Sequence, residues 1–234
     1  MSNRLSEFLY NCPLHRHLLP GHNCELCAGA SEADLVCADC AAELPALPEH
    51  CPQCALPNRS GAICGSCLRR APWFDRTLAL WRYEFPCDRL VLSLKYHARI
   101  ALADFFARAL AARASPAVDC IVPMPLHPKR LARRGFNQAV EIARLLSRSS
   151  GIPMAARCVR RLRDTAPQTG LPYRSRAKNV RGAFACDPDL SGRTVAVVDD
   201  VMTTGATLNE LARILKRAGA ARVENWVIAR TMPP

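Results

Sequence analysis

The stretch that decides the fold runs from residue 197 to residue 208 and reads Val197-Val198-Asp199-Asp200-Val201-Met202-Thr203-Thr204-Gly205-Ala206-Thr207-Leu208. An apolar run at residues 194–198 predicts a buried strand, and two adjacent carboxylates follow at its end. Residues 208–218 have the apolar spacing of a helix, so a short polar loop joins a strand to a helix. Open α/β sheets bind ligands at this position, beyond the carboxyl end of a strand.

The side chains and backbone of this loop match one type of ligand. Neighbouring carboxylates accept hydrogen bonds from neighbouring hydroxyls of a sugar. A glycine lets the backbone approach an anion, and the start of a helix offers free N–H groups and a positive dipole end. We therefore interpret the loop as a site for a ribose with a 5′-phosphate. The predicted residues are Asp199 and Asp200 at the reacting sugar, and Thr203, Thr204, Gly205, Ala206 and Thr207 at the phosphate. An ordinary capped helix start is the alternative, but a cap needs one such residue.

Positive charge is concentrated in one segment. The formal net charge is +12, and residues 129–181 contain fourteen Lys and Arg against Glu141 and Asp164, which accounts for the whole excess. Such a segment favours polyanionic partners, either diphosphate groups or nucleic acid, with a solvated face as the alternative. The sequence contains no apolar run long enough for a membrane span, and its amino end lacks the apolar segment of a signal peptide. We therefore expect a cytoplasmic protein.

Eight of the thirteen cysteines form two tandem copies of one pattern. Each Cys-x-x-Cys pair of the first copy recurs 27 residues later, and nine residues separate the two pairs of a copy. Two such pairs complete a tetrahedral shell of four thiolates for a structural Zn²⁺. The duplication favours one zinc ion per copy, although an interleaved pairing stays open, and redox chemistry is a weaker alternative. The predicted ligands are Cys24, Cys27, Cys37, Cys40, Cys51, Cys54, Cys64 and Cys67.

Beyond the cysteines, predicted strands alternate with predicted helices. We expect strands at residues 77–83, 119–124, 158–162, 194–198 and 222–229, and helices at residues 88–94, 100–113, 137–150 and 208–218. This alternation predicts an α/β fold with a mostly parallel sheet and helices on both faces. We expect two domains, a zinc module at residues 1–70 and the α/β domain at residues 71–234.

A second polar loop follows the strand predicted at residues 119–124. Its proline-rich turn leads into a basic run, and guanidinium and amide groups donate hydrogen bonds to phosphate oxygens. Arg133, Arg134 and Asn137 are therefore predicted to bind a diphosphate. The alternative is a rigid connection in which Asn137 caps the next helix. The long polar stretch at residues 160–184 is predicted to be functional or mobile, because connections of this length are uncommon inside a compact domain.

The acid pair followed by Thr-Thr-Gly-x-Thr resembles the phosphoribosyl-diphosphate loop of type I phosphoribosyltransferases. The wider set of motifs resembles the ComF family. These motifs are the Cys-x-x-Cys module, Val-Pro-Met-Pro-Leu at residue 122, Arg-Arg-Gly-Phe-Asn-Gln at residue 133, and Gln168 with Arg176-x-x-Asn179. The resemblance implies a double zinc ribbon fused to a type I phosphoribosyltransferase-like domain, and a link to DNA uptake in natural transformation.

The function that we expect is binding of phosphoribosyl diphosphate with Mg²⁺ by a phosphoribosyltransferase whose acceptor the sequence does not identify. A non-catalytic sensor of phosphoribosyl diphosphate, or a protein that binds single-stranded DNA, is the alternative. DNA-processing proteins are further candidate partners. A third alternative is an adaptor that docks a partner through its zinc module. The oligomeric state is not predicted.

Overall fold

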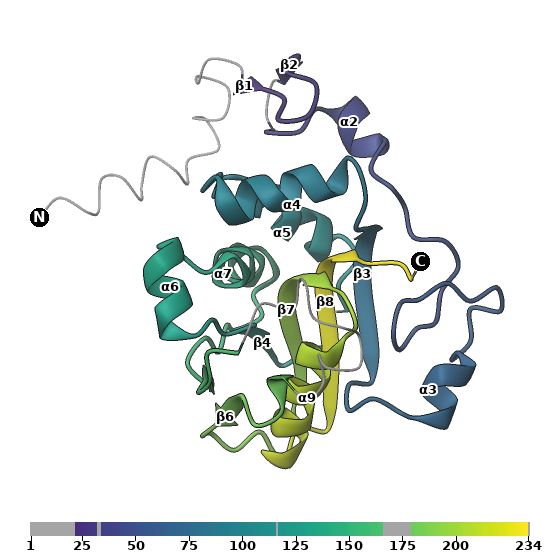
Figure 1. The fold of residues 1–234 in the computed structure, drawn as a ribbon, viewed down its shortest axis with the longest axis vertical. Helices are drawn as coiled ribbons and strands as arrows, with labels where there is room; N and C mark the ends of the chain where they lie inside the picture. The colour runs from purple at the N-terminus through teal and green to yellow at the C-terminus, as the bar shows by residue number, and fades with distance from the viewer. Residues whose placement is uncertain (1–21, 32–33, 116, 166–178, 234) are drawn as a thin grey trace, which may run out of the picture. The chain divides into compact units, whose positions relative to one another are not determined.

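A computed structural model describes residues 22–31, 34–115, 117–165 and 179–233 (Figure 1). The chain divides into two compact units, Met1–Leu44 and Pro45–Pro234. The first cysteine copy belongs to the first unit, whereas the second copy belongs to the same unit as the sheet. The domain boundary predicted at residue 70 stays a prediction.

The 27-residue repeat of the cysteines is also a repeat of structure. In the first unit, β1 (His22–Asn23) pairs with β2 (Ala30–Ser31), and α2 (Ala38–Ala42) follows. The second copy ends in α3 (Gly65–Arg69), whose bounds lie 27 residues after those of α2. Ala28 and Ala55, which are also 27 residues apart, both have a positive φ, of 58° and 57°. The backbone therefore turns in the same way after the first Cys-x-x-Cys pair of each copy.

The sheet of the second unit is parallel throughout. Its four strands are β3 (Arg76–Arg82), β4 (Cys120–Pro123), β7 (Thr194–Met202) and β8 (Arg222–Arg230), in the order β3-β8-β7-β4. A separate antiparallel pair joins β5 (Val159–Arg161) to β6 (Phe184–Cys186). The predicted parallel α/β sheet is confirmed.

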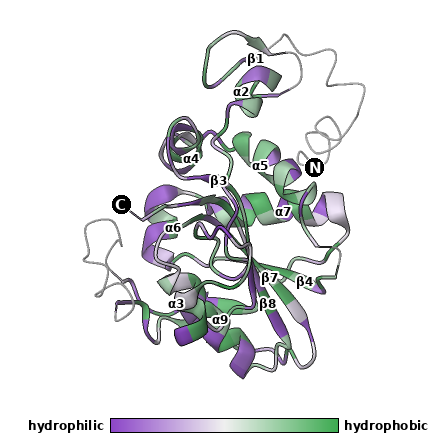
Figure 2. Cartoon of the chain, turned by 90° about the vertical axis from the view of Figure 1, so that its right-hand side faces the viewer, coloured by the Kyte–Doolittle hydropathy of each residue, from purple (hydrophilic) through white to green (hydrophobic). Residues whose placement is uncertain are grey.

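Helices cover both faces of this sheet (Figure 1). On one face lies α9 (Ala206–Arg217), and on the other lie α5 (Leu102–Ala111) and α7 (Gln138–Ser150), with α4 (Cys87–Tyr96) beside α5. Both hydrophobic and hydrophilic segments are visible along α9 in Figure 2, as expected of a helix with one buried side.

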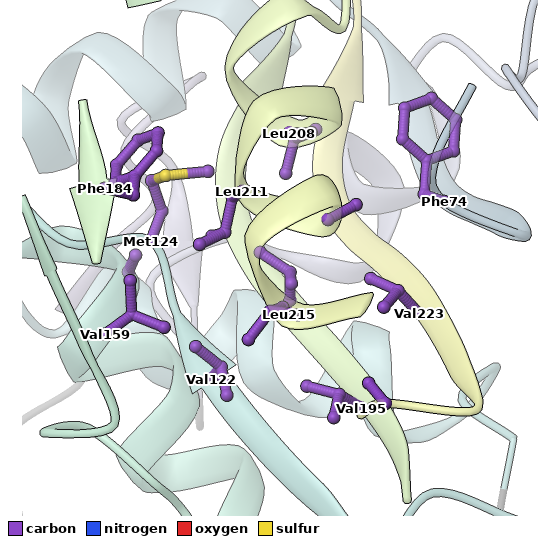
Figure 3. Close-up of a cluster of buried hydrophobic side chains, with 14 of the residues drawn as sticks. Phe74, Val122, Met124, Val159, Phe184, Val195, Leu208, Leu211, Leu215 and Val223 are labelled. Atoms are coloured by element: carbon purple, nitrogen blue, oxygen red, sulfur yellow. The ribbon is translucent and has the colours of Figure 1, made fainter. Parts of the chain in front are cut away.

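The core under α9 explains why this helix packs where it does. Leu208, Leu211 and Leu215 project from successive turns onto Val195 and the strands beside it (Figure 3). Alternate residues of β7 face this cluster because side chains of a strand alternate between the two faces of a sheet. The loop before α9 is therefore held over the carboxyl end of β7.

Strand β6 was not predicted, and two further differences from the sequence-based expectation lie next to the site. The proline-rich turn contains α6 (Pro128–Arg134), which begins after His127, where a proline at the first helical position is tolerated. Strand β7 continues to Met202 and does not end at Val198, because the strand pairing with β8 continues through the acid pair. Within the described residues, no helix has both the length and the apolar character that crossing a membrane requires.

Candidate ligand site and metal centres

The loop between β7 and α9 encloses a small hollow at the carboxyl edge of the sheet. The residues that line it are Asp199, Val201, Met202, Thr203, Gly205, Ala206, Thr207 and Leu208. Apart from Thr204, the residues predicted for the phosphate are thus brought together, and Asp199 lines the same hollow. The hydroxyl oxygen of Thr204 instead accepts a hydrogen bond from the N–H of Ala206 at 3.3 Å, which supports the start of α9.

The backbone of this loop offers donors to an anion. Gly205 has φ 77° and occupies the cap position of the twelve-residue helix α9. In the described part of the chain, no residue accepts a hydrogen bond from the backbone N–H groups of Thr203, Thr204 and Gly205. Free N–H groups at the positive end of a helix favour a phosphate or another anion. The hollow therefore has the chemistry of a phosphate site.

The two acids of β7 have different surroundings. Asp199 borders the hollow, whereas Asp200 is buried on the side of α4 and α7, as the alternation of a strand requires. Burial and the charge of Asp200 raise the pKa of Asp199 to about 8. Burial alone would raise the pKa of Asp200 as well, but the charge of Lys95 and the hydrogen bonds to Asp200 hold it below its usual range. Asp200 is therefore ionised, while Asp199 takes up a proton near neutral pH.

The partners of Asp200 come from distant parts of the sequence. Lys95 Nζ of α4 lies 2.8 Å from Asp200 Oδ2, and Gln138 Nε2 of α7 donates a hydrogen bond to the same oxygen at 3.1 Å. Arg134 donates to Gln138 Oε1 at 2.6 Å and places its guanidinium over the ring of Tyr96, 5.7 Å from the centroid. This network connects the basic turn with the acid pair. Lys95 was not predicted as a site residue. In the sequence it is one lysine beside the apolar face of an amphipathic helix, and nothing distinguishes it from an ordinary surface lysine.

The three residues predicted for the diphosphate differ in what they do. Arg133 is exposed at the end of α6, and Arg134 belongs to the network of Asp200. Asn137 caps α7 by accepting from Ala139 N–H at 3.0 Å, and it donates to the carbonyl of Met124 at 3.0 Å. The capping alternative is therefore observed for Asn137, while phosphate binding by the three residues stays a prediction.

Part of the long polar stretch approaches the site. Arg161 donates to Thr165 Oγ1 at 2.6 Å, and its guanidinium lies 5.4 Å from the centroid of the Phe184 ring. Burial and the charge of Arg130 lower the pKa of Arg161, while Asp199 favours its charged form. Gln168 and Arg176, which contribute to the family resemblance, lie outside the described residues.

Arg230, the last residue of β8, was not predicted from the sequence either. Its side chain is buried and donates hydrogen bonds to the backbone carbonyls of Met202, Thr203 and Thr231, and to that of Cys54. An arginine at the end of an apolar strand gives no sign in the sequence that it binds a loop of another element. It connects the predicted phosphate loop with the second cysteine copy.

Each cysteine copy forms its own cluster of four sulfur atoms. In each cluster the Sγ atoms lie within 4.8 Å of one another. Backbone N–H groups approach equivalent sulfurs, with Cys37 N 3.4 Å from Cys24 Sγ and Cys64 N 3.3 Å from Cys51 Sγ. Four thiolates are the donor set of a closed structural zinc site. The residues thus fit two zinc ions, one in each copy, and the interleaved pairing is ruled out by the geometry.

The parallel sheet, with its acid pair and threonine-rich turn in front of α9, defines a phosphoribosyltransferase-type domain, here accompanied by zinc ribbons. The family described as phosphoribosyl transferase domain matches residues 131–232, and the double zinc ribbon domain matches residues 14–68. The DNA utilization protein YhgH of Escherichia coli (strain K12) is 36% identical over 206 residues, which span 84% of this chain and 91% of that protein. Competence protein F of Haemophilus influenzae is 29% identical over 241 residues, which span 98% of this chain and 100% of that protein. The chain belongs to the ComF family.

A solved structure with partial similarity is the glutamine phosphoribosylpyrophosphate amidotransferase from B. subtilis, complexed with ADP and GMP. It superposes with a TM-score of 0.42 and 18% sequence identity. The superposition covers 58% of this chain and 30% of that longer chain.

Proposed function

We propose that this protein binds phosphoribosyl diphosphate together with Mg²⁺ and acts in the handling of DNA taken up by the cell. The observation that carries the proposal is the hollow at the end of β7, which is lined by a carboxylate, by two threonines and by Gly205, with the free N–H groups of Thr203 and Gly205 among its residues. The 5′-phosphate occupies the N–H cradle, and Asp199 accepts hydrogen bonds from the ribose hydroxyls. The names of the relatives, which refer to DNA utilization and competence, support the second half of the proposal.

The other charged groups near the hollow have separate roles in binding the ligand. Mg²⁺, which prefers oxygen ligands, neutralises diphosphate charge when it is bound with the ligand. Arg133 and Arg134 steady the diphosphate, and the pair of Lys95 with Asp200 fixes the acid-bearing end of β7. In a transferase these groups stabilise positive charge at the sugar carbon and negative charge on the departing diphosphate.

Titration calorimetry with phosphoribosyl diphosphate tests the proposal. We expect binding in the presence of Mg²⁺ and loss of at least about tenfold in affinity when EDTA removes it, because the metal screens the charge of the ligand. Asp199→Asn is expected to weaken binding. The control Asp187→Asn changes an exposed acid that pairs with Arg160, and it is expected to bind as the wild type does. Absence of binding by the wild-type protein would refute the proposal.

The raised pKa of Asp199 predicts a pH dependence. Its folded pKa of about 8 lies above the unfolded value, so the folded state holds an extra proton between these values. Stability therefore falls as the pH rises through this window and levels off above about 8. The Mg²⁺-dependent affinity rises in the same window, by up to about tenfold per pH unit, because ligand binding needs the carboxylate. Calorimetry between pH 6 and pH 9 measures this slope, which Asp199→Asn should abolish; an unchanged slope in that variant contradicts the assignment.

Single-stranded DNA is a second candidate ligand. Arg133, Arg163 and Arg181 of the basic segment are exposed, and Arg163 donates to the backbone carbonyl of Arg181 at 2.8 Å, which holds these two parts of the segment together. Arg160 and Arg161 are less suitable, because the first pairs with Asp187 and the second packs on Phe184.

The DNA proposal predicts a salt-dependent interaction. We expect Arg133→Glu with Arg163→Glu to weaken DNA binding and to reduce the slope of log affinity against log salt by about 0.7 for each phosphate that the two side chains no longer neutralise. Fluorescence anisotropy with a labelled oligonucleotide measures both quantities. Arg193→Glu with Arg217→Glu, two exposed arginines outside residues 129–181, is the control of matched charge. Equal losses in the control and in Arg133→Glu with Arg163→Glu would mean that net charge, and not this segment, binds DNA.

A further inference from the structure

Arg230 is a buried cation that donates hydrogen bonds to backbone carbonyls of the predicted phosphate loop. Its Nη1 lies 2.9 Å from the Met202 carbonyl oxygen and also donates to the carbonyl of Thr203. These two carbonyls belong to the first peptide groups of that loop. Only 3% of the residue is exposed, so the contacts are shielded from water.

The position of these carbonyls determines where the loop's N–H groups point. In a trans peptide the C=O and N–H bonds point in opposite directions. The carbonyl of Met202 shares its peptide group with the N–H of Thr203, and the carbonyl of Thr203 shares its own with the N–H of Thr204. Holding both carbonyls against Arg230 therefore turns both N–H groups away from its guanidinium group. Arg230 thus helps to orient these two donors of the loop.

The other end of the guanidinium is attached to the second zinc ribbon. Arg230 Nε donates to the carbonyl oxygen of Cys54 at 2.9 Å. Ala55, which follows this ligand, is completely buried in the same cluster as Phe74, Met202 and Leu208. The second ribbon therefore packs directly beneath the phosphate loop.

Further hydrogen bonds fasten this ribbon to the edge of the sheet. Thr77 Oγ1 donates to the carbonyl of Gln53 at 2.6 Å, and Thr77 N donates to the carbonyl of Pro52 at 3.0 Å. The side chain of Gln53 in turn donates to the carbonyl of Phe74 at 3.1 Å. All three bonds join residues between the two cysteines of one zinc-binding turn to β3 or to the segment just before it. The geometry of that turn is thus coupled to β3 and, through Arg230, to the loop.

The equivalent turn of the first copy has no such role in the described structure. It belongs to the other compact unit, and Ala28, the counterpart of Ala55, is exposed. Two copies with the same sulfur geometry therefore have different surroundings. The difference offers a built-in control for any function of the second ribbon.

We propose that the second zinc ribbon is part of the phosphoribosyl site, and that Arg230 is the positioning residue that couples the Cys51–Cys54 turn to the N–H cradle. The inference rests on the proposed binding of phosphoribosyl diphosphate. Zinc at the second cluster fixes the position of the Cys54 carbonyl. This carbonyl holds the guanidinium group of Arg230 in place, and Arg230 in turn orients the N–H donors of the loop. Because coupling between two sites is reciprocal, the ligand stabilises zinc at the second cluster and not at the first.

Serine substitutions at Cys27 and Cys54, equivalent ligands of the two copies, test the coupling. We expect two zinc ions per wild-type chain and one in each variant, measured by mass spectrometry of the metal. Calorimetry should show unchanged affinity for phosphoribosyl diphosphate in Cys27→Ser and a loss of at least about tenfold in Cys54→Ser. Equal affinities in the two variants would overturn the inference.

Arg230→Lys tests the same coupling with all zinc ligands intact, and Arg222→Lys, in the same strand, is its control. Lysine keeps the charge but cannot bond to both the loop and Cys54, because it lacks the planar fork of arginine. We expect two zinc ions in both variants and about tenfold weaker ligand binding in Arg230→Lys alone. In a chelator chase with pyridylazoresorcinol, the ligand should slow the release of one zinc ion at least about fivefold in the wild type, and not in Arg230→Lys.

Failure of the proposed function and failure of this inference have different signatures. If the wild-type protein does not bind phosphoribosyl diphosphate, the proposed function falls. The inference is then judged from zinc release without ligand, where Arg230→Lys should accelerate the loss of one of the two ions at least about fivefold. Release rates equal to those of Arg222→Lys would overturn it.

Discussion

Asp200→Asn is expected to lower the free energy of unfolding by about 3 kcal/mol, because it leaves the ammonium group of Lys95 buried without its counter-charge. The two groups lie 2.8 Å apart, and the side chains of Lys95 and Asp200 are 25% and 6% exposed. This value is at the lower end of the loss in unfolding free energy that is usual when one partner of a buried ion pair is removed, because the Lys95 side chain keeps some exposure to water. Urea unfolding followed by tryptophan fluorescence measures the change.

The neighbouring acid provides the matched control for this variant. Asp199→Asn removes a carboxyl whose pKa is already raised to about 8, so the fold loses little at neutral pH while ligand binding is weakened. Lys95→Met combined with Asp200→Asn should recover most of the stability, because both charges are then absent. A single Asp200→Asn variant as stable as the wild type would mean that the pair contributes nothing to the fold.

Gly205→Ala is expected to reduce affinity for phosphoribosyl diphosphate by at least about tenfold, through displacement of the loop. The residue has φ 77°, which costs an L-amino acid about 1–2 kcal/mol. A Cβ placed there lies 2.7 Å from Met202 Cε, so the methionine must also move. Calorimetry and urea unfolding separate the loss of binding from the loss of stability.

Gly192→Ala is the control because it has a similar φ of 73° and a Cβ added there meets open space. Gly192→Ala should lose about as much unfolding free energy from backbone strain as Gly205→Ala does, and it should keep its affinity for the ligand. If Gly205→Ala binds as tightly as Gly192→Ala, the backbone at Gly205 is not part of the phosphate site.

The parts of this protein that sequence reasoning predicted are local in the chain. The acid pair, the threonine-rich turn and the helix behind it follow one another within twelve residues, from Val197 to Leu208. Each zinc cluster likewise draws its four ligands from a short segment. Residue type and spacing suffice in such cases because the backbone between the functional groups has few possible paths.

The parts that were not predicted depend on packing between distant elements. Lys95 reaches Asp200 because α4 lies beside the carboxyl edge of the sheet, and Arg230 reaches the loop because β8 pairs with β7. Nothing in a lysine of an amphipathic helix, or an arginine at the end of a strand, identifies its partner. The opposite orientation of the two acids also required the strand to continue to Met202, beyond the apolar run that predicted it.

The different protonation of the two carboxyl groups has a consequence for how a polyanion enters. With Asp199 protonated and Asp200 balanced by Lys95, the hollow carries almost no net negative charge at neutral pH. A ligand rich in phosphate is then not repelled on approach. If Asp199 accepts hydrogen bonds from the ribose hydroxyls, as proposed, it gives up its proton on binding, and binding is thereby linked to the release of one hydrogen ion to the solvent.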